Sequence, residues 1–311
     1  MDSERGAARG GGGRCARIVF EQPHAVNQKR HERRPTAGTP LSFLEEASIV
    51  SVPHATAHPL RAKLASGSSI AGIWMELPTA QASGTVAAAG FDFVILDCEH
   101  GGFDFAALEA AITAAEFGGT SPIVRVPGPD PFFVQRALDL GADGIMVPQI
   151  PDFDAAERAV RMAHFAPLGT RGMNPFTRGG NYGLPPQPKY VPGYPFTGVL
   201  VESPSAASHL PRIVELPLLD HVYLGVYDYA VALGIPGQVD DPRVTAFVES
   251  ASRLARAAGK SVGTTVMNEA QARRFTGMGV NVLLYGTDTW ILGQGAKAGL
   301  ALYAQFGWKP R

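Results

Sequence analysis

Eight short apolar runs, separated by stretches of helical period, are the feature that most constrains the fold of this 311-residue chain. From about residue 69 onward, runs rich in Val, Ile and Phe alternate with Ala-rich stretches in which apolar residues recur at helical spacing. Continuous apolar strands that alternate with helices are typical of a parallel sheet whose outer face is covered by those helices. The runs span residues 69–77, 91–99, 122–127, 144–150, 197–203, 221–228, 261–268 and 280–288.

The number of these units predicts how the sheet is arranged. Eight βα units in roughly 240 residues match the size of a closed (β/α)8 TIM barrel. An open doubly wound sheet is the alternative, but no G-x-G-x-x-G motif follows the first run and the count of eight favours closure. We therefore predict an α/β protein with a single-domain TIM barrel over residues 64–305.

The N-terminal part of the chain has a different character. Residues 1–40 contain eight Lys or Arg residues and a run of four glycines, without a sustained apolar period. Residues 1–60 are therefore predicted to be a disordered extension. An Arg-rich start also suits a mitochondrial transit peptide, but such segments are poor in acidic residues. Those present here are Asp2, Glu4, Glu21 and Glu32. The expected location is cytoplasmic, with mitochondrial targeting as the alternative.

Composition excludes several classes of partner. The formal net charge of −1 gives no electrostatic footprint for nucleic acid. No stretch approaches the ~18 uninterrupted apolar residues of a transmembrane helix, so no membrane partner is expected. The two cysteines, Cys15 and Cys98, cannot form a disulfide framework and suit a reducing compartment.

Two segments interrupt the alternation of strands and helices. Residues 167–195 are too rich in Gly and Pro for a helix, and a loop of this length inside a compact domain is usually functional. We expect this loop to pass over a face of the barrel. Residues 289–308 form a long apolar helix with few charges, and a neighbouring subunit is expected to cover part of it.

Polar residues at the carboxyl ends of the apolar runs are the candidate functional groups, because TIM barrels carry their chemistry at that end. The candidates are Trp74, Asp97, Cys98, Glu99, His100, Arg125, Gln149, Glu202, Asp228 and Asp288. Charges gathered at one end of a barrel must pair with each other or bind a cation, because burying an unpaired charge costs several kcal/mol.

Glu202 and Asp228 end neighbouring strands, so their carboxylates are expected to lie close together. Oxygen ligands favour a hard divalent cation, Mg²⁺ or Mn²⁺. The alternative is that each carboxylate caps a helix or pairs with an arginine. His100, beside Glu99 and facing Arg125, is either a structural histidine or an acid–base group. Cys98 is expected to serve packing.

The positions of the lysines argue against Schiff-base chemistry, which needs a buried lysine amine. None of the six lysines ends an apolar run, and only Lys189, in the long loop, is expected to be able to reach the carboxyl end of the barrel.

Several motifs occur in an order that resembles a known family. They are FDFVILDCEHGGFD (91–104), SPIVRVPGPDP (121–131), RALDLGADGIMVPQI (136–150), RG (171–172), LVES (200–203) and YLGVYD (223–228). Together they resemble the HpcH/HpaI aldolases, metal-dependent class II pyruvate aldolases that include 2-keto-3-deoxy acid aldolases and are similar to macrophomate synthase. The resemblance covers residues 64–305.

This resemblance implies roles for particular residues. Glu202 and Asp228 match the metal ligands, with Mg²⁺, Mn²⁺ or Co²⁺ as the ion. His100 matches the acid–base histidine, Asp139 its carboxylate partner, and Arg125 the arginine that stabilises an enolate. Four residues match positions around the substrate: Trp74, Glu99, Arg171 and Gly172. The family also implies a homohexamer in which the last helix is exchanged between subunits.

The implied function is a lyase that cleaves a 4-hydroxy-2-oxo acid to pyruvate and an aldehyde, with oxaloacetate decarboxylation as a side activity. This chain departs from the family at Leu200, where Gln is usual, at Val226 and Tyr229 in GVYDYA, and after R-G in MNPFTRGGNY. Two alternatives therefore stay open. One is a CoA-thioester lyase like the citrate lyase β-subunit, whose basic patch would be Arg171, Arg178 and Lys189. The other is a barrel that binds a ligand without turnover.

Overall fold

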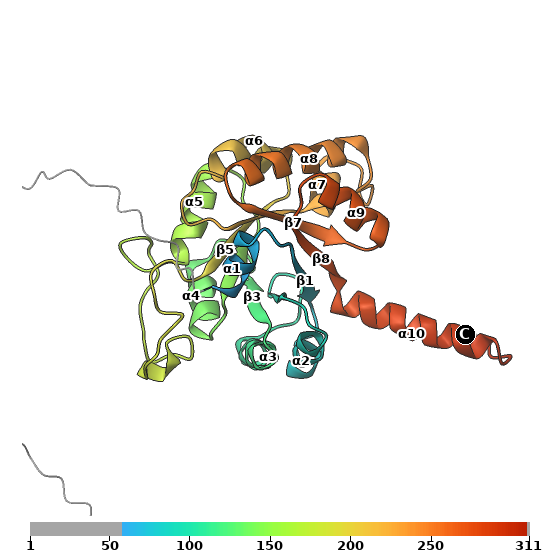
Figure 1. The fold of residues 1–311 in the computed structure, drawn as a ribbon, viewed down its shortest axis with the longest axis horizontal. Helices are drawn as coiled ribbons and strands as arrows, with labels where there is room; N and C mark the ends of the chain where they lie inside the picture. The colour runs from blue at the N-terminus through green and yellow to red at the C-terminus, as the bar shows by residue number, and fades with distance from the viewer. Residues whose placement is uncertain (1–57, 310–311) are drawn as a thin grey trace, which may run out of the picture. The chain divides into compact units, whose positions relative to one another are not determined.

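The computed structural model describes residues 58–309 and confirms the predicted closed barrel (Figure 1). Parallel strands pair in chain order from β1 to β8, and β8 pairs back with β1. Each strand overlaps one of the predicted apolar runs. The strands are β1 Ile70–Met75, β2 Phe93–Asp97, β3 Ser121–Arg125, β4 Gly144–Val147, β5 Phe196–Val201, β6 His221–Leu224, β7 Ser261–Val266 and β8 Val282–Thr287. The predicted extension, residues 1–60, lies almost entirely outside the described residues.

Side chains alternate along each strand between the barrel interior and the surrounding helices. Trp74, Ile95 and Leu200 belong to the interior cluster and are almost completely buried. Glycine is needed where a large neighbour fills this space, because a Cβ on Gly72 would lie 2.3 Å from the ring of Phe93. The barrel interior is therefore a packed core.

Each helix that directly follows a strand begins near the carboxyl ends of the strands, and most of these helices run back along the outside (Figure 1). Most have an Asp, Ser, Thr or Asn side chain that caps the first turn, as in Asp130 before α4 and Ser203 before α6. The helices are α1 Pro59–Ala65, α2 Ala80–Ala88, α3 Phe105–Phe117, α4 Pro131–Asp139, α5 Phe153–Met162, α6 Pro204–Ile213, α7 Val226–Ala232, α8 Pro242–Ala257, α9 Glu269–Gly277 and α10 Asp288–Ala304.

The sixth apolar run is shorter as a strand than the sequence suggests. β6 ends at Leu224, and α7 begins at Val226, so Asp228 lies in the first turn of a helix and not at a strand end. Gly225 allows the turn, because a Cβ there would lie 2.7 Å from the Cβ of Glu202. The close approach brings the start of α7 against the end of β5.

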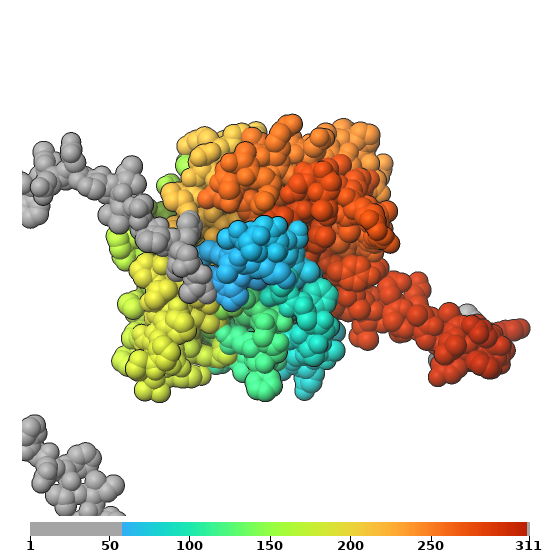
Figure 2. Space-filling view, viewed as in Figure 1, coloured from blue at the N-terminus to red at the C-terminus, as the bar shows by residue number. Residues whose placement is uncertain are grey.

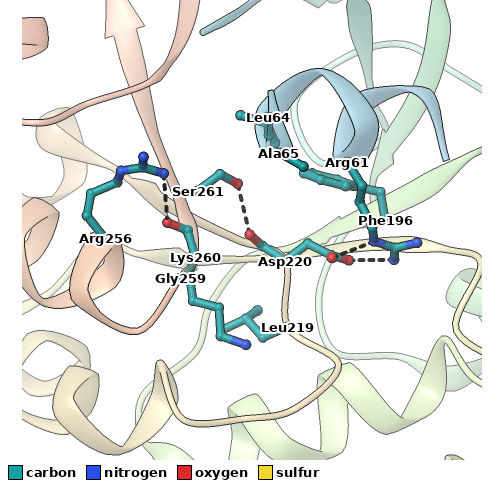
Figure 3. Close-up of a pocket in the computed structure, with 10 residues that line it drawn as sticks. All are labelled: Arg61, Leu64, Ala65, Phe196, Leu219, Asp220, Arg256, Gly259, Lys260 and Ser261. Atoms are coloured by element: carbon teal, nitrogen blue, oxygen red, sulfur yellow. Dashed lines mark hydrogen bonds and ion pairs between the residues drawn. The ribbon is translucent and has the colours of Figure 1, made fainter. Parts of the chain in front are cut away.

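Helix α1 closes the amino-terminal end of the barrel. Leu60, 2% exposed, joins the interior cluster, and Arg61 forms a two-pronged ion pair with Asp220, with N–O distances of 2.7 and 2.8 Å. Figure 2 shows α1 on the surface of this face, and Figure 3 shows Arg61 and Asp220 facing each other beside a cavity of about 230 Å³. Because its guanidinium pairs with Asp220, Arg61 anchors α1 to the barrel.

The long loop, residues 163–195, lies at this same amino-terminal end. It follows α5 and leads into β5, and a segment from a helix end to the next strand start must lie there. Lys189 pairs with Glu116, the next-to-last residue of α3, and lies 2.7 Å from Asp143, just before β4. The expectation that Lys189 could reach the carboxyl end is therefore wrong.

Helix α10 projects away from the barrel (Figure 1). Only its first turn is held, where Asp288 is buried against the loop that follows β1. Beyond that turn, large apolar side chains are exposed, among them Leu292 at 64% and Leu300 at 45%. Among the described helices, none is both long and apolar enough to cross a membrane.

Candidate active site

A buried ion pair joins the carboxyl ends of β2 and β3. Asp97 and Arg125 are register partners, and both side chains point into the barrel. The Arg125 Nε donates to Asp97 Oδ1 at 2.8 Å, Nη2 donates to Oδ2, and Nη1 lies 3.2 Å from Glu99 Oε2. Its guanidinium carbon also lies 4.3 Å from the centre of the Trp74 ring. These contacts fix the guanidinium in one orientation.

The charge of Arg125 is stabilised by the same contacts. Burial by itself would lower the pKa of Arg125, but the hydrogen bond and negative charge of Asp97, together with Glu99, raise it above the ordinary value. Arg125 is therefore a permanent cation.

Asp97 also shapes the loop after β2. Its Oδ1 accepts hydrogen bonds from the backbone N–H groups of Glu99 at 3.0 Å and His100 at 3.1 Å. The sequence places Asp97 among the polar residues that end the apolar runs but assigns it no specific role. Its position two residues after Ile95, on the inward face of the same strand, was the signal that could have indicated one.

Gln149, after β4, connects two carboxylates. Its backbone N–H donates to Glu202 Oε1 at 2.8 Å, and its side-chain amide donates to Glu99 Oε1 at 3.0 Å. It adopts a left-handed backbone conformation with φ of 59°, which is uncommon for a residue other than glycine. The sequence noted Gln149 as a polar strand end but did not predict this bridging.

Glu202 and Asp228 form the predicted carboxylate pair. Burial raises the pKa of Glu202 above its ordinary value, and the nearby charges of Asp228 and Glu99 raise it further. Its second oxygen has no hydrogen-bond partner among residues 58–309, and the exposed Asp228 pairs with no cation in that range. Two adjacent carboxylates with uncommitted oxygens suit a divalent cation whose other ligands are water or substrate. No preformed group of three or more ligands exists among the described residues.

A pocket of about 290 Å³ opens beside these groups at the carboxyl end of the barrel. On its floor, the Trp74 indole N–H donates to Thr265 Oγ1 at 2.9 Å, and the Tyr223 hydroxyl lies 2.6 Å from the same oxygen. Leu200 completes the floor. Arg125 and Asp228 both line the pocket, so a fixed cation and a carboxylate face one small volume.

Most of the predicted site residues are brought together here. Trp74, Glu99, Arg125, Glu202 and Asp228 surround or adjoin the pocket. His100 lies at the rim, where its side chain is 66% exposed and its Nε2 is 4.0 Å from Glu99 Oε2.

The other three predicted site residues lie elsewhere in the chain. Asp139 is the last residue of α4, at the amino-terminal end of the barrel, and accepts from Arg171 at 2.7 Å and from the Tyr190 hydroxyl at 3.1 Å. Gly172 lies beside Gln135 of α4. The contact between His100 and Asp139 is therefore not formed within the single chain, and Arg171 and Gly172 do not line the pocket. Helix α4 starts near the pocket, so its last residue lies at the opposite end of the barrel. The loop that follows α5 begins at that same amino-terminal end.

Comparison with known proteins identifies the family. The model of the HpcH/HpaI aldolase/citrate lyase family matches residues 71–293. The chain is 32% identical to a pyruvate aldolase of Rhizobium etli, over 78% of this chain and 96% of the relative. It is 30% identical to a 4-hydroxy-2-oxo-heptane-1,7-dioate aldolase of Salmonella typhimurium, over 76% and 89%. This chain belongs to the HpcH/HpaI aldolase/citrate lyase family.

The fold agrees with other HpcH/HpaI proteins. An HpcH/HpaI aldolase from Desulfitobacterium hafniense superimposes with a TM-score of 0.73 at 28% identity, covering 82% of this chain and all of that one. The protein is accordingly a lyase of the aldolase type. The resemblance inferred from the motifs is confirmed.

Proposed function

We propose that the protein cleaves a 4-hydroxy-2-oxo acid to pyruvate and an aldehyde. The observation that carries this proposal is the carboxylate pair, Glu202 and Asp228, beside a pocket whose guanidinium, Arg125, is fixed on the same side of the barrel. A 2-oxo acid has a carboxylate and a keto oxygen, which Arg125 and a divalent cation held by the two carboxylates would bind. The names of the Rhizobium and Salmonella relatives support the same chemistry.

A divalent cation is part of the proposal, and members of this family generally depend on one. Glu202 and Asp228 would hold it, and when bound it would act as a Lewis acid toward the keto oxygen. Gln149 would keep the Glu202 carboxylate in place through its backbone N–H. We propose Mg²⁺ or Mn²⁺, with Co²⁺ as a further option, because the ligands are oxygens.

Arg125 would stabilise the negative charge of the enolate, and His100 would accept the proton of the C4 hydroxyl. Three nitrogens of Arg125 contact Asp97 and Glu99, and its remaining N–H groups are available to an enolate oxygen. When the C3–C4 bond breaks, its electron pair forms the enolate of pyruvate, and the C4 hydroxyl proton passes to His100. Protonation of C3 then gives pyruvate, so that substrate and products balance without a further reactant.

The thioester alternative is disfavoured by the position of the basic residues. Arg178 and Lys189 both pair with Glu116, and Arg171 pairs with Asp139, all at the amino-terminal end of the barrel. Among the described residues they therefore provide no basic patch at the pocket mouth for the phosphates of CoA.

Exchange of the pyruvate methyl protons with D₂O tests the enolate step without an aldehyde. We expect exchange with Mg²⁺ or Mn²⁺, none with a chelator, and a loss of about 100-fold or more in Glu202→Gln and Arg125→Lys. Metal-dependent oxaloacetate decarboxylation should fall in the same variants. Glu157→Gln, an exposed change on α5, is the matched control. Absence of exchange at any metal concentration would contradict the proposal and favour a ligand-binding barrel.

A further inference from the structure

The charges around the pocket bear on the half of the substrate that becomes the aldehyde. Among the described residues that line the pocket, Arg125 is the only cationic side chain, and it already contacts Asp97 and Glu99. Glu76 and Asp228 also line the pocket, and neither forms an ion pair with a described cation. The charged side chains of the lining are therefore predominantly acidic.

Glu76 is held at the rim by groups that leave its charge unbalanced. Its Oε2 accepts from the hydroxyl of Thr289 at 2.6 Å, and its backbone N–H donates to Asp288 Oδ1 at 2.9 Å. Asp288 is itself a buried carboxylate. The side of the pocket formed by β1 and α10 thus presents negative charge and no described cation.

The remaining wall is neutral. It consists of apolar, aromatic and hydroxyl-bearing side chains and two glycines: Gly225, Val226, Tyr227, Thr265, Met267, Gly286 and Thr287. On the side toward His100, the nearby charge is the carboxylate of Glu99. Arg136 does not line the pocket, because its guanidinium lies over the Phe105 ring, with its carbon 5.1 Å from the ring centre.

Charge balance indicates the consequence. Glu76, Asp97, Glu99, Glu202 and Asp228 carry five negative charges, against one on Arg125 and two on the proposed cation. The pocket keeps a formal charge of −2 before the 2-oxo acid adds its own carboxylate. A second carboxylate on the substrate would find no unengaged cation in the described lining and would face like charge at close range.

We infer that the aldehyde half of the substrate is uncharged, an aliphatic or hydroxylated aldehyde without a second carboxylate. This inference rests on the proposed function and narrows it. It separates this chain from the Salmonella relative, whose name records a substrate with a carboxylate at each end.

A matched pair of substrates tests the inference. 4-Hydroxy-2-oxoheptanoate and 4-hydroxy-2-oxoheptane-1,7-dioate have the same chain length and differ in the terminal carboxylate. Pyruvate release by the full chain with Mn²⁺ should give a kcat/KM about tenfold or more higher for the monoacid, mostly through KM. An equal or higher kcat/KM for the diacid would overturn the inference.

Variants of Glu76 locate the source of discrimination. Glu76→Gln keeps an acceptor for the Thr289 hydroxyl and should lower the ratio of kcat/KM for the monoacid to kcat/KM for the diacid. Glu76→Lys should lower this ratio further or reverse the preference. Glu157→Gln removes the same charge outside the pocket and should leave the ratio unchanged. A ratio unaffected by Glu76→Lys would overturn the electrostatic argument. Pyruvate methyl exchange, measured on each preparation, separates the two failures, because its absence refutes the proposed function itself.

Discussion

Glu202 illustrates how one residue couples stability to metal binding. Burial and the charges of Asp228 and Glu99 raise its pKa, so the charged form is disfavoured in the folded protein. For an acid with a raised folded pKa, the stabilising contribution is present below the ordinary pKa and is lost as pH rises through the folded pKa. The ionised carboxylate therefore destabilises the metal-free protein at neutral pH.

We predict that Glu202→Gln raises the Tm of the metal-free protein at pH 7 by about 1–3 °C. The glutamine still accepts from the Gln149 N–H but carries no charge. The difference from the natural chain should vanish at pH values below the ordinary pKa of glutamate, where both side chains are neutral. Thermal unfolding between pH 4 and 8, with and without Mn²⁺, measures this. If Mn²⁺ raised the Tm of Glu202→Gln as much as it raises the Tm of the natural chain, the assignment of Glu202 as a metal ligand would be contradicted.

Gln149 is predicted to be a positioning residue. Gln149→Gly keeps the left-handed backbone and the N–H to Glu202 and removes the amide that binds Glu99. We expect kcat to fall about tenfold with little change in metal affinity and no loss of Tm, since glycine adopts this φ without strain. The pH dependence of kcat should also shift, because Glu99 lies next to Arg125 and His100. Loss of metal affinity equal to the loss of kcat would indicate a purely structural role.

At the scale of elements, the long loop is bound to the barrel by Lys189. Its amine pairs with Glu116 and Asp143 and donates to the Gly141 carbonyl, and its side chain is 18% exposed. Removing one partner of a largely buried ion pair leaves carboxylates uncompensated. This network makes the loop part of the amino-terminal face and leaves the pocket to the strand ends.

We predict that Lys189→Met destabilises the protein by about 1–3 kcal/mol and leaves kcat/KM within about twofold. Urea unfolding and pyruvate release give the two quantities. Lys63→Met is the matched control, since its pair with Asp92 is exposed and should contribute less than about 1 kcal/mol. If Lys189→Met abolished turnover, and if borohydride trapped pyruvate covalently on the natural chain, the two results would instead indicate Schiff-base chemistry.

At the scale of the whole molecule, α10 is an apolar helix whose side chains beyond the first turn are exposed among the described residues. Large apolar side chains exposed in a projecting helix predict self-association. The family resemblance predicts a hexamer in which this helix is exchanged.

Light scattering after size-exclusion chromatography tests this prediction. We expect an assembly larger than a monomer for the full chain, and smaller species for Leu292→Glu and Leu300→Glu. Lys297→Gln, a change at a polar position of the same helix, should leave the assembly intact. A monomeric natural chain would contradict the prediction.

The sequence predicted the barrel because its signals are local. An apolar run such as residues 91–99 and the helical period after it record which faces are buried. That Asp97 and Arg125 end neighbouring strands also follows from strand order, but the sequence did not predict that they pair. The closeness of Glu202 and Asp228 was predicted from the same rule, because the two apolar runs that carry them are consecutive in the chain.

One expectation was wrong because chain direction decides which end of the barrel a loop occupies. The loop at residues 163–195 follows a helix and precedes a strand, so that order places Lys189 at the amino-terminal end. Arg171 and Gly172 lie in the same loop, and Asp139 ends a helix that begins near the pocket, so none of the three lines the pocket of the single chain. The roles that the family resemblance implies for these three residues stay predictions.

The sequence by itself determined the number and order of the strands, because hydrophobic periodicity is a property of neighbouring residues. It did not determine where β6 ends, and Asp228 lies in the helix that follows. The tertiary structure decided which side chains engage one another: Asp97 with Arg125, Gln149 with two carboxylates, and Glu76 at the rim without a cation. Those contacts depend on backbone conformation and on the approach of distant segments, as at Gly225 and Gln149. Closure of the barrel is what brings them to one pocket.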